Sequence, residues 1–432
     1  MTSLAGFTTG EAYALQLDAS DPVPSQRSRF HVPSGKGGEV AYLCGNSLGL
    51  QPRAARAMIQ QELDDWQNLA VEGHHHAARP WYPYHEQFAP GLERILGAQP
   101  GAGEVVAMNS LTVNLHLMLA TFYQPTPDRP LIALDGPVFP SDLYAAQTHA
   151  RVRGIDPADA IYIIQPRDPL HGPLDIETIE AELDRIGERI SVLLFSGVNF
   201  LSGQAHDISR ITALGHTYGC IVGFDLAHAA GNLELKLHEW NVDFASWCSY
   251  KYLNGGPGAV AGCFIHERHA RNVDLPRLAG WWGNDPESRF RMHLDADFVA
   301  RPTAEGWQLS NPPVLAMTPL LASLDVFEKA GGMHALRQRS LRLTSYLRAL
   351  LEALIPEEVC TIITPRDEDA FGCQLSLVFS NSDDARARHA ALQAHDIVCD
   401  FRPPDVIRLA PTPLYNTFHD CWRGAQAMAE TS

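Results

Sequence analysis

Short apolar runs alternate with helical stretches through the middle of the chain. From about residue 104 onward the apolar runs are VVAMN, PLIALD, AIYIIQ, SVLLFSG, IVGFD, VDFASWCSYKY and AVAGCFIHE. Helical stretches such as DIETIEAELDRIG and ISRITALGHTYG separate them. This alternation is typical of βαβ crossovers, in which helices cover a parallel sheet. We therefore predict an α/β fold with a mostly parallel sheet.

The two ends of the chain depart from this pattern. Near the N-terminus, the run YLCGNSLGLQP predicts a strand and then a loop, because two glycines break it. The Pro-rich segment at 310–319 precedes a long helical segment to about residue 355 and the runs IITP, QLSLVFS, DIVCDFRP and VIRLAP. These elements favour a smaller α+β domain. We predict a large domain over 46–310 and a small domain formed by 1–45 together with 311–432.

The segment PRAARAMIQQELDDWQNLA predicts an amphipathic helix near the start of the large domain. Its proline suits the first turn of a helix. Ala55, Ile59, Leu63 and Trp66 recur at helical spacing and mark the apolar face.

Composition narrows the class of protein. The 432 residues are 45% hydrophobic and 19% charged, which is ordinary for a globular chain of one or two domains. The formal net charge of -17, without a compact Lys/Arg cluster, disfavours nucleic acid and anionic membranes as partners. No apolar run approaches the ~20 residues needed to cross a bilayer, and the N-terminus lacks a basic region before an apolar core. We expect a soluble protein that is not exported.

The cysteines are scattered along the chain and include no CxxC pair. They are Cys44, Cys220, Cys248, Cys263, Cys360, Cys373, Cys399 and Cys421. Because they form no dense framework of the kind found in small secreted domains, a reducing cytoplasm fits them best.

The most informative stretch runs from Ile221 to Ile265. Four mostly apolar residues end in Asp225, so its carboxylate would emerge at the carboxyl end of a buried strand, where open α/β sheets bind ligands. Lys251 follows and precedes the turn LNGGPG, whose glycines allow close backbone approach. A lysine in a semi-apolar site loses hydration, which lowers its pKa and makes its amine able to form an imine. His228 lies three residues beyond Asp225, near enough to share one ligand.

These residue types match the needs of pyridoxal phosphate. The cofactor needs an amine for its aldehyde, an anion that keeps its ring nitrogen protonated, and donors for its phosphate. Lys251 and Asp225 meet the first two needs. Ser110 and Thr112 lie at a predicted strand-to-helix turn, where a helix N-terminus would hold the phosphate.

Further motifs give the chain a family resemblance. Asp-x-x-His after a strand, followed by SYKY and GGPG, resembles the class V aminotransferase group of fold type I pyridoxal-phosphate enzymes. Within that group the chain resembles the kynureninase family, whose members split kynurenine into anthranilate and alanine. The matching strings are YLCGNSLGLQP, GHHHAARPW, NSLTVNLHLML, GPVFPSDLYA, CSYKYLNGGPG, GWWGN, SNPP and VIRLAPTPLYN. They extend over residues 42–416 in the expected order.

The resemblance implies a fold type I architecture with a mostly parallel seven-stranded sheet, and it implies roles for individual residues. Lys251 would hold pyridoxal 5′-phosphate as a Schiff base, and Asp225 would pair with the ring nitrogen. Tyr250 would relay a proton at the substrate's ketone. Other cofactor contacts would come from Leu111, Thr112, Phe139, Ser141, Asp142, His228 and Tyr250. The second subunit of a homodimer would contribute Trp281 and Asn311.

The resemblance also implies substrate contacts. Arg408 would bind the α-carboxylate, because its planar guanidinium suits a bidentate contact. His74 and Asn311 would lie near the aromatic ring. Since both side chains could hydrogen-bond a ring hydroxyl, we hypothesise that 3-hydroxykynurenine is a good substrate. The implied enzyme is a hydrolase of carbon–carbon bonds in tryptophan catabolism and NAD precursor metabolism.

Simpler roles remain open for several of these residues. Phe139 and Trp281 could serve only in packing. Arg408 could pair with Asp400 or Asp405 instead of a substrate. Likewise, Ser141 and Asp142 could cap a helix while they contact the cofactor.

One cluster and one departure concern regions outside the cofactor motif. The consecutive His74, His75 and His76 could suggest a metal, but neighbouring side chains face different directions and supply two ligands at most, so we expect no metal. The family usually has histidine or a similar residue directly after GWWG or GWFG, where this chain has Asn284. That change bears on a loop expected to meet the second subunit.

Other activities remain as alternatives. A class V aminotransferase would use the same site, whereas a cysteine desulfurase would need an exposed nucleophilic cysteine on a mobile loop. Cys360, Cys373 and Cys399 instead lie in or beside predicted strands. A non-catalytic scaffold would be expected to lack Lys251 or Asp225, and a dinucleotide-binding oxidoreductase would need GxGxxG after its first strand.

Overall fold

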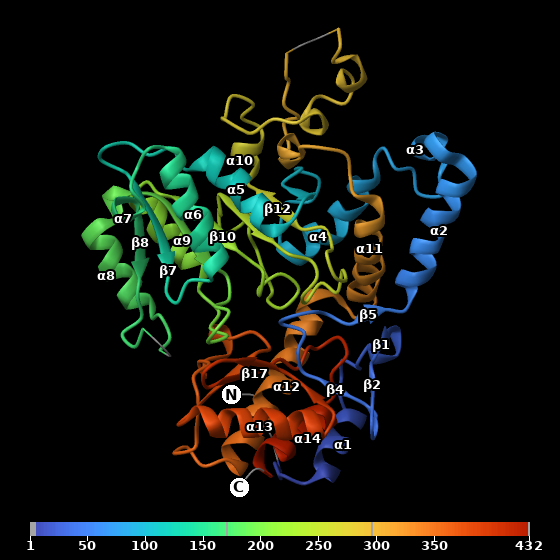
Figure 1. The fold of residues 1–432 in the computed structure, drawn as a ribbon, viewed down its shortest axis with the longest axis vertical. Coiled ribbons are helices and arrows are strands. Elements are labelled where there is room, and N and C mark those ends of the chain that lie inside the picture. Colours follow the sequence, from blue (N-terminus) through green and yellow to red (C-terminus); the bar gives the residue numbers. More distant parts are fainter. Residues whose placement is uncertain (1–5, 170–171, 295–296, 431–432) are drawn as a thin grey trace.

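The computed structural model describes residues 6–169, 172–294 and 297–430. Figure 1 shows a larger part, built on a seven-stranded sheet, and a smaller part at the bottom that holds both ends of the chain. In the described residues, none of the helices combines the length and apolar character needed to span a membrane.

The larger part is built on a seven-stranded sheet. Its strand order is β6-β12-β11-β10-β9-β7-β8, and β12 runs in the opposite direction to the other six strands. The strands are β6 (Val105–Ala107), β7 (Leu131–Asp135), β8 (Ile161–Ile164), β9 (Ile190–Ser196), β10 (Ile221–Asp225), β11 (Phe244–Trp247) and β12 (Gly262–Ile265). The predicted α/β fold with a mostly parallel seven-stranded sheet is confirmed.

The sheet is buried on both faces, because successive side chains of a strand enter two different apolar cores. In β9, Leu193 and Phe195 join one core, while Val192 and Leu194 join the other. The first core includes residues of α8 (Ile176–Ile186), α9 (Ile208–Thr217) and α11 (Val314–Lys329). The second includes residues of α5 (Leu111–Phe122) and α6 (Pro140–Val152). Helices therefore cover both faces.

The smaller part contains a four-stranded antiparallel sheet of order β13-β14-β17-β16. Its strands are β13 (Cys360–Ile362), β14 (Leu375–Phe379), β16 (Asp400–Arg402) and β17 (Val406–Leu409). Its helices are α12 (Gly332–Leu354), α13 (Ser382–Ala394) and α14 (Phe418–Ala429). The N-terminal segment joins this core through α1 (Glu11–Ala19) and through β4 (Ala41–Tyr42), which pairs in parallel with β15 (Ile397–Val398). The exact domain limits stay a prediction.

Two helical regions differ from the sequence pattern. The helix expected from about 317 to 355 is two helices, α11 and α12, because Gly331 adopts a φ of 91° between them. In α2 (Ala54–Leu69), Leu63 and Trp66 are 38% and 60% exposed, whereas Glu62 is buried. The apolar face of α2 is therefore packed only in part against its own chain.

The remaining elements are short. The strands are β1 (Phe30–His31), β2 (Ser34–Gly35), β3 (Gly38–Glu39) and β5 (Gln51–Pro52). The α-helices are α3 (Gly73–His76), α4 (Ala89–Leu96), α7 (Pro157–Ala160) and α10 (Glu267–Ala270). The 3-10 helices are η1 (Arg27–Arg29), η2 (Ala70–Glu72), η3 (Tyr84–Phe88), η4 (Gly187–Arg189), η5 (Trp281–Gly283), η6 (Arg289–Arg291), η7 (Ala304–Trp307) and η8 (Glu368–Ala370).

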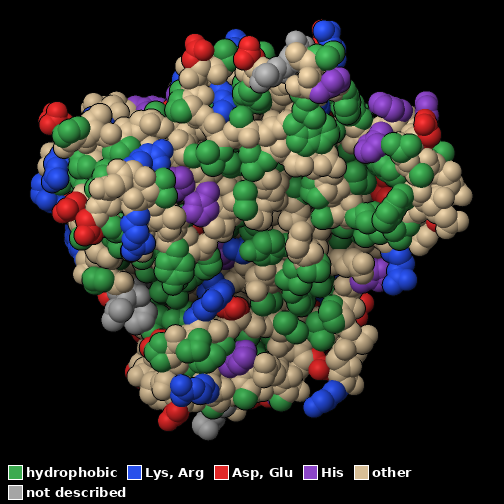
Figure 2. Space-filling model, turned by 45° about the horizontal axis from the view of Figure 1, so that its top comes forward, with side chains coloured by type: hydrophobic (Ala, Val, Ile, Leu, Met, Phe, Trp, Pro, Cys, Tyr) green, Lys and Arg blue, Asp and Glu red, His purple; other side chains and the backbone are tan. Residues whose placement is uncertain are grey.

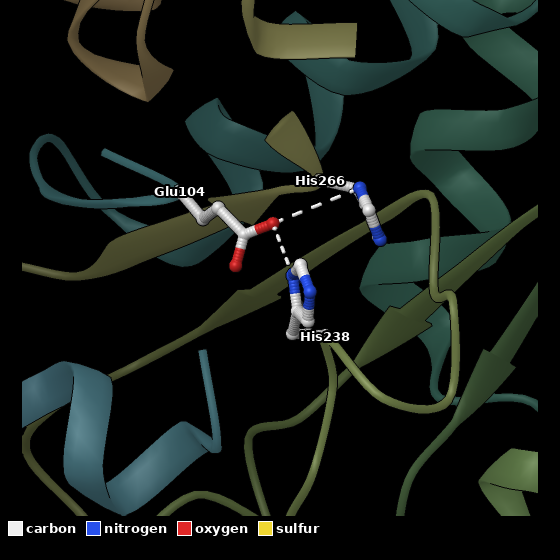
Figure 3. Close-up of side chains that lie close together, drawn as sticks. All are labelled: Glu104, His238 and His266. Carbon is white, nitrogen blue, oxygen red and sulfur yellow. Dashed lines mark hydrogen bonds and ion pairs between the residues drawn. The ribbon is translucent and has the colours of Figure 1, made fainter. Parts of the chain in front are cut away.

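A polar cluster of Glu104, His238 and His266 is drawn in Figure 3. Glu104 precedes β6 and His266 follows the antiparallel β12, so the cluster lies at the end of the strands opposite to Asp225. His238 Nδ1 donates to Glu104 Oε1 at 2.9 Å, and His266 Nδ1 lies 3.7 Å from the same oxygen. The two imidazoles stack with their centroids 4.8 Å apart and their planes 20° apart. His266 Nδ1 also accepts a hydrogen bond from the Arg268 amide at 3.3 Å, so these side chains form a hydrogen-bonded cluster.

This cluster predicts a pH dependence of stability. Burial, followed by the charge of Arg268, lowers the pKa of His266 to about 4. Between the unfolded pKa near 6.5 and pH 4, the unfolded chain holds more protons, so the free energy of unfolding falls as the pH falls. We expect His266→Gln to reduce that loss by about 2 kcal/mol, whereas the exposed His76→Gln leaves it unchanged. Thermal unfolding at pH 7 and pH 4.5 measures both, and an equal loss in wild type and His266→Gln contradicts the expectation.

Candidate active site

A cavity opens at the carboxyl ends of the parallel strands of the large sheet. Asp135 ends β7, Ser196 ends β9 and Asp225 ends β10, and all three residues line the cavity. The N-termini of α5 and α6 and the loop after β11 complete its wall. The predicted site residues found in this wall are Leu111, Thr112, Phe139, Ser141, Asp142, Asp225, His228, Tyr250 and Lys251. The fold thus brings distant motifs into one place.

Lys251 and His228 are in direct contact in the wall of this cavity. Burial lowers the pKa of His228 well below its usual value, and the charge of Lys251 lowers it further, so the imidazole is neutral. Lys251 Nζ donates to His228 Nε2 at 3.0 Å. His228 Nδ1 is buried and has no hydrogen-bond partner within the described ranges. Such an atom marks a place where a bound group can satisfy the protein.

The loop that carries Lys251 packs directly on the N-terminal GNSLGL motif. The Gly49 amide donates to the Tyr250 carbonyl at 2.8 Å. A Cβ added at Gly49 would lie 2.3 Å from the Lys251 carbonyl oxygen, far inside contact distance. Glycine is required for this close approach. A motif near the N-terminus therefore helps to position the lysine.

Asp135 is a buried carboxylate with several donors. It accepts hydrogen bonds from Ser196 N at 2.8 Å and Ser196 Oγ at 2.5 Å, and it lies 3.2 Å from His206 Nε2. Burial raises the pKa of Asp135, but the contacts with His206 and Ser196 outweigh it, and the net pKa is lowered. Asp135 is therefore a satisfied anion in the cavity wall.

Asp142 and Asp225 are neighbouring buried carboxyl groups in the cavity wall. Burial raises the pKa of Asp142 well above its usual value, and the charge of Asp225 raises it further. Burial also raises the pKa of Asp225, although the Ala227 amide, which donates to its Oδ1 at 2.6 Å, and the charge of Lys251 oppose that rise. Asp142 is therefore the more readily protonated of the two carboxyl groups, and Asp225 is the more readily charged.

Two helices begin at the cavity and create an anion site. Neither α5 nor α6 has a side-chain cap at its N-terminus, and Thr112 Oγ1 lies 3.0 Å from Ser141 Oγ. Uncapped N–H groups and two hydroxyls favour a bound phosphate. Phe139 precedes α6, is 40% exposed and meets Phe200 edge to face with the centroids 5.3 Å apart. Its ring therefore borders the same cavity.

Tyr250 is placed beside the lysine that follows it. Lys251 Nζ lies 5.9 Å from the centroid of the Tyr250 ring. Burial raises the pKa of the Tyr250 hydroxyl, and the neighbouring Cys248 raises it further. The phenol therefore keeps its proton near neutral pH and can act as a donor.

Arg408 borders the cavity without lining it. Its Nη1 donates to the carbonyl of Phe200, which does line the cavity. Its Nε and Nη2 bind Asp400 at 2.7 and 2.6 Å. The ion pair with Asp400, one of the alternatives raised by the sequence, is thus present, and the contact with a substrate stays a prediction.

His74 and Asn311 lie in a second pocket, away from the first. In Figure 1 the helix α3, which carries His74, is at the far right, and α6 of the first cavity is at the left. The second pocket is lined by Glu62, Trp66, His74, Trp81, Trp282, Asn311, Pro312, Pro313, Val314, Leu315 and Ala316. Trp281 lies instead in a hollow with Asn284 and Phe298. Within one chain these three predicted residues do not meet the first cavity.

An arm coloured yellow to orange projects beyond the large sheet at the top of Figure 1, and Asn284 forms a bridge with Ala300 in this part of the chain. Asn284 Oδ1 accepts from Val299 N at 2.8 Å. On this arm Phe290 and Met292 are 59% and 48% exposed. The residue that departs from the resemblance therefore shapes an apolar surface feature.

Asp135, Ser196 and Phe200 line the cavity although the sequence had not singled them out. Asp135 and Ser196 follow the apolar runs LIAL and VLLF, just as Asp225 follows IVGF. A polar residue at the carboxyl end of a buried strand is the signal that would have found both. Phe200 lies in an irregular loop and had no comparable signal.

The donor set fits pyridoxal phosphate. A lysine amine, a buried carboxylate and an anion site at two helix N-termini line one cavity, and these are the groups that the cofactor needs. The unpartnered His228 Nδ1 and the exposed ring of Phe139 add a polar contact and a flat surface for a ring.

Comparison with known proteins decides the family. Residues 336–428 match the family model described as the kynureninase C-terminal domain. A kynureninase of Koribacter versatilis is 49% identical and covers 98% of both chains. Another, of Myxococcus xanthus, is 50% identical over 98% of this chain and 97% of its own. The chain belongs to the kynureninase family. Its cofactor is pyridoxal 5′-phosphate, so the predicted resemblance and cofactor are confirmed.

Solved structures outside the kynureninase family share the fold at low sequence identity. A variant of the C-S lyase C-DES, with glycine covalently linked to its pyridoxal-phosphate cofactor, gives a TM-score of 0.76 at 16% identity, covering 91% of this chain and 97% of that one. The cysteine desulfurase CsdA of Escherichia coli gives 0.74 at 17% identity, covering 93% and 96%. At such identities the likeness shows the fold alone, and the predicted fold type I architecture is confirmed.

Proposed function

We propose that this chain hydrolyses the Cβ–Cγ bond of L-kynurenine, of 3-hydroxy-L-kynurenine or of both. The products are L-alanine and the matching anthranilate, within tryptophan catabolism and NAD precursor metabolism. The meeting of Lys251, Asp225 and His228 in one cavity of a kynureninase-family chain carries the proposal.

Lys251 serves two purposes in this reaction. When bound, pyridoxal phosphate supplies an aldehyde that forms an imine with an amine and a ring that takes up an electron pair from the substrate's α-carbon. Lys251 holds the cofactor between turnovers. In the presence of substrate, the free lysine amine would remove a proton from the α-carbon and return it. The neutral His228, 3.0 Å away, accepts a hydrogen bond from Lys251 and so orients the amine.

Asp225 and Asp142 act together on charge. Asp225 presents a negative charge that keeps a ring nitrogen protonated, and the neighbouring Asp142 is the more readily protonated carboxyl group of the two. Asp135, paired with His206, adds a second negative charge to the wall, which opposes ionisation of Asp142.

Tyr250 and Arg408 act on the substrate itself. Arg408 binds the α-carboxylate and orients the side-chain ketone toward Tyr250. Because its pKa is raised, Tyr250 keeps its proton and donates it to the ketone oxygen as water adds to the carbonyl carbon. The Cβ–Cγ bond of the resulting hydrate then breaks, and the anthranilate leaves before alanine.

An assay of the purified holoenzyme tests the activity. We expect L-kynurenine to yield fluorescent anthranilate and one equivalent of L-alanine without added keto acid. Accumulation of a keto-acid product in place of anthranilate would instead indicate a class V aminotransferase. Sulfur release from L-cysteine would indicate a desulfurase, which the buried or half-buried positions of all the cysteines disfavour.

The second pocket supports a homodimer with shared active sites. It places His74 and Asn311 beside three tryptophans, and it adjoins apolar side chains that a single chain leaves exposed. These are Trp66 and Leu315, which line the pocket and are 60% and 41% exposed. Figure 2 shows apolar side chains on the side of the molecule where α2 and α11 lie. We therefore propose that this pocket faces the first cavity of the partner subunit and receives the substrate's aromatic ring.

Subunit mixing tests the shared site. We expect Lys251→Ala alone to be inactive, and the double variant His74→Ala, Asn311→Ala to be strongly impaired. Co-expressed chains should recover up to about a quarter of wild-type activity, because half of the dimers are mixed and each mixed dimer has one intact site. No recovery, despite mixed dimers isolated through two affinity tags, would mean that each site is built from one chain.

The second pocket also leads to a prediction about whether the enzyme prefers a hydroxylated or an unsubstituted aromatic ring. We expect kcat/KM for 3-hydroxy-L-kynurenine to equal or exceed that for L-kynurenine, and His74→Ala to lower the first value more than the second, because a ring hydroxyl would lose its partner. A large preference of the wild type for the unsubstituted ring would contradict this hypothesis.

A further inference from the structure

The small sheet has one charged face. Along β16 and β17, Asp400, Arg402 and Arg408 alternate with Phe401 and Ile407. The two apolar residues pack in the core of the smaller part. Asp400 and Arg408 are direct cross-strand partners, so the charged side chains share the opposite face of the sheet.

Both arginines donate to the same oxygen of Asp400. Arg408 binds Oδ2 through Nε at 2.7 Å and Nη2 at 2.6 Å, and Arg402 binds it through Nε at 3.0 Å. The side chain of Arg408 is 1% exposed, that of Asp400 is 15% exposed and that of Arg402 is 43% exposed. Asp400, Arg402 and Arg408 thus form a charged unit. Its two positive charges and one negative charge leave it with a net positive charge.

The unit faces the first cavity. Arg408 donates to the carbonyl of Phe200 in the cavity wall. The charges of Arg408 and Arg402, after burial and the charge of Lys251, lower the pKa of His228. Both arginines therefore lie within electrostatic reach of the imidazole that contacts Lys251.

The other titratable groups around the unit do not neutralise it. Burial raises the pKa of Cys44 to about 11 and raises the pKa of Cys399 and of Tyr252, so these groups are uncharged near neutral pH. Burial also lowers the pKa of His389, which stacks on Phe401 on the other face of the sheet. A half-buried unit with one uncompensated positive charge is stabilised by an anion.

We propose that Arg402 is a second arginine of the substrate-carboxylate site, held beside Arg408 by their shared contact with Asp400. The inference rests on the proposed function, in which Arg408 binds the α-carboxylate. One carboxylate brings the unit to neutrality and offers an oxygen to each guanidinium. Because Arg402 is the more exposed arginine, an incoming amino acid meets it first and is then passed to Arg408.

The test separates the two halves of the substrate. L-Alanine carries the α-carboxylate, and 2-aminoacetophenone carries the aromatic ketone without one. We expect Arg402→Gln in the holoenzyme to raise the inhibition constant of L-alanine and the KM of L-kynurenine about tenfold. The inhibition constant of 2-aminoacetophenone and kcat should stay within about twofold. Arg402→Lys keeps the charge and should recover part of the loss.

Arg386→Gln is the matched control, because Arg386 is also on the smaller part, is 56% exposed and pairs with Asp383 at 3.1 Å. An L-alanine inhibition constant in Arg402→Gln equal to that of the control overturns the proposal. So does an equal rise for both inhibitors, which indicates general distortion. If the wild type fails to cleave L-kynurenine, the proposed function fails, while L-alanine binding read from cofactor absorbance still decides the role of Arg402.

Discussion

Replacing Lys251 with alanine will abolish both kynurenine cleavage and the visible absorption band of the lysine-bound cofactor. The Lys251 amine lies in the cofactor cavity, where it donates a hydrogen bond to His228 at 3.0 Å. Without the amine, neither the resting imine nor proton transfer at the α-carbon is possible. We expect kcat to fall at least about a thousandfold. Absorbance spectra and anthranilate fluorescence measure the two effects.

Lys236→Ala is the control for this variant, because Lys236 is 53% exposed and lies in an ion pair with the surface residue Glu239. It should keep both signals. Thermal unfolding of Lys251→Ala should remain cooperative, since the lysine borders a cavity rather than the apolar core. A Lys251→Ala protein that retains the absorption band would place the cofactor on another amine and remove the basis of the proposed mechanism.

The strands of the large sheet could be predicted because they are buried on both faces and therefore appear as continuous apolar runs. Their order could not, since it depends on contacts between segments far apart in the chain. The antiparallel direction of β12 shows this limit. In α2 the spacing of Leu63 and Trp66 predicted an apolar face, but spacing cannot distinguish burial in the chain's own core from exposure.

The sequence predicted those residues of the candidate site that have a recognisable signal in their own short stretch of the chain. Asp225 ends an apolar strand and Lys251 precedes a glycine turn, so each has a sequence signal of its own. The Asp135–His206 pair joins residues 71 positions apart, and only the folded chain brings them together. His74 and Asn311 came from the resemblance alone, because their shared pocket combines α3 with the distant segment before α11.

Asp225→Asn will separate charge from shape at the cofactor's ring nitrogen. Asparagine keeps the size of the side chain and can still accept a hydrogen bond from the Ala227 amide, which lies 2.6 Å from Asp225 Oδ1. It cannot supply the negative charge that keeps the ring nitrogen protonated. We therefore expect Asp225→Asn to bind the cofactor and show the absorption band, while kcat falls at least about a hundredfold.

The pH profile of this variant gives the sharper result. In the wild type we expect Asp225 to keep the ring nitrogen protonated across neutral pH, so kcat should change little there. In Asp225→Asn the proton must come from solvent, and kcat should rise as the pH is lowered from 8 to 6. The exposed Asp383→Asn, at a side chain 95% exposed, should match the wild type. A uniformly low, pH-independent kcat in Asp225→Asn would mean that Asp225 acts by positioning the ring rather than by its charge.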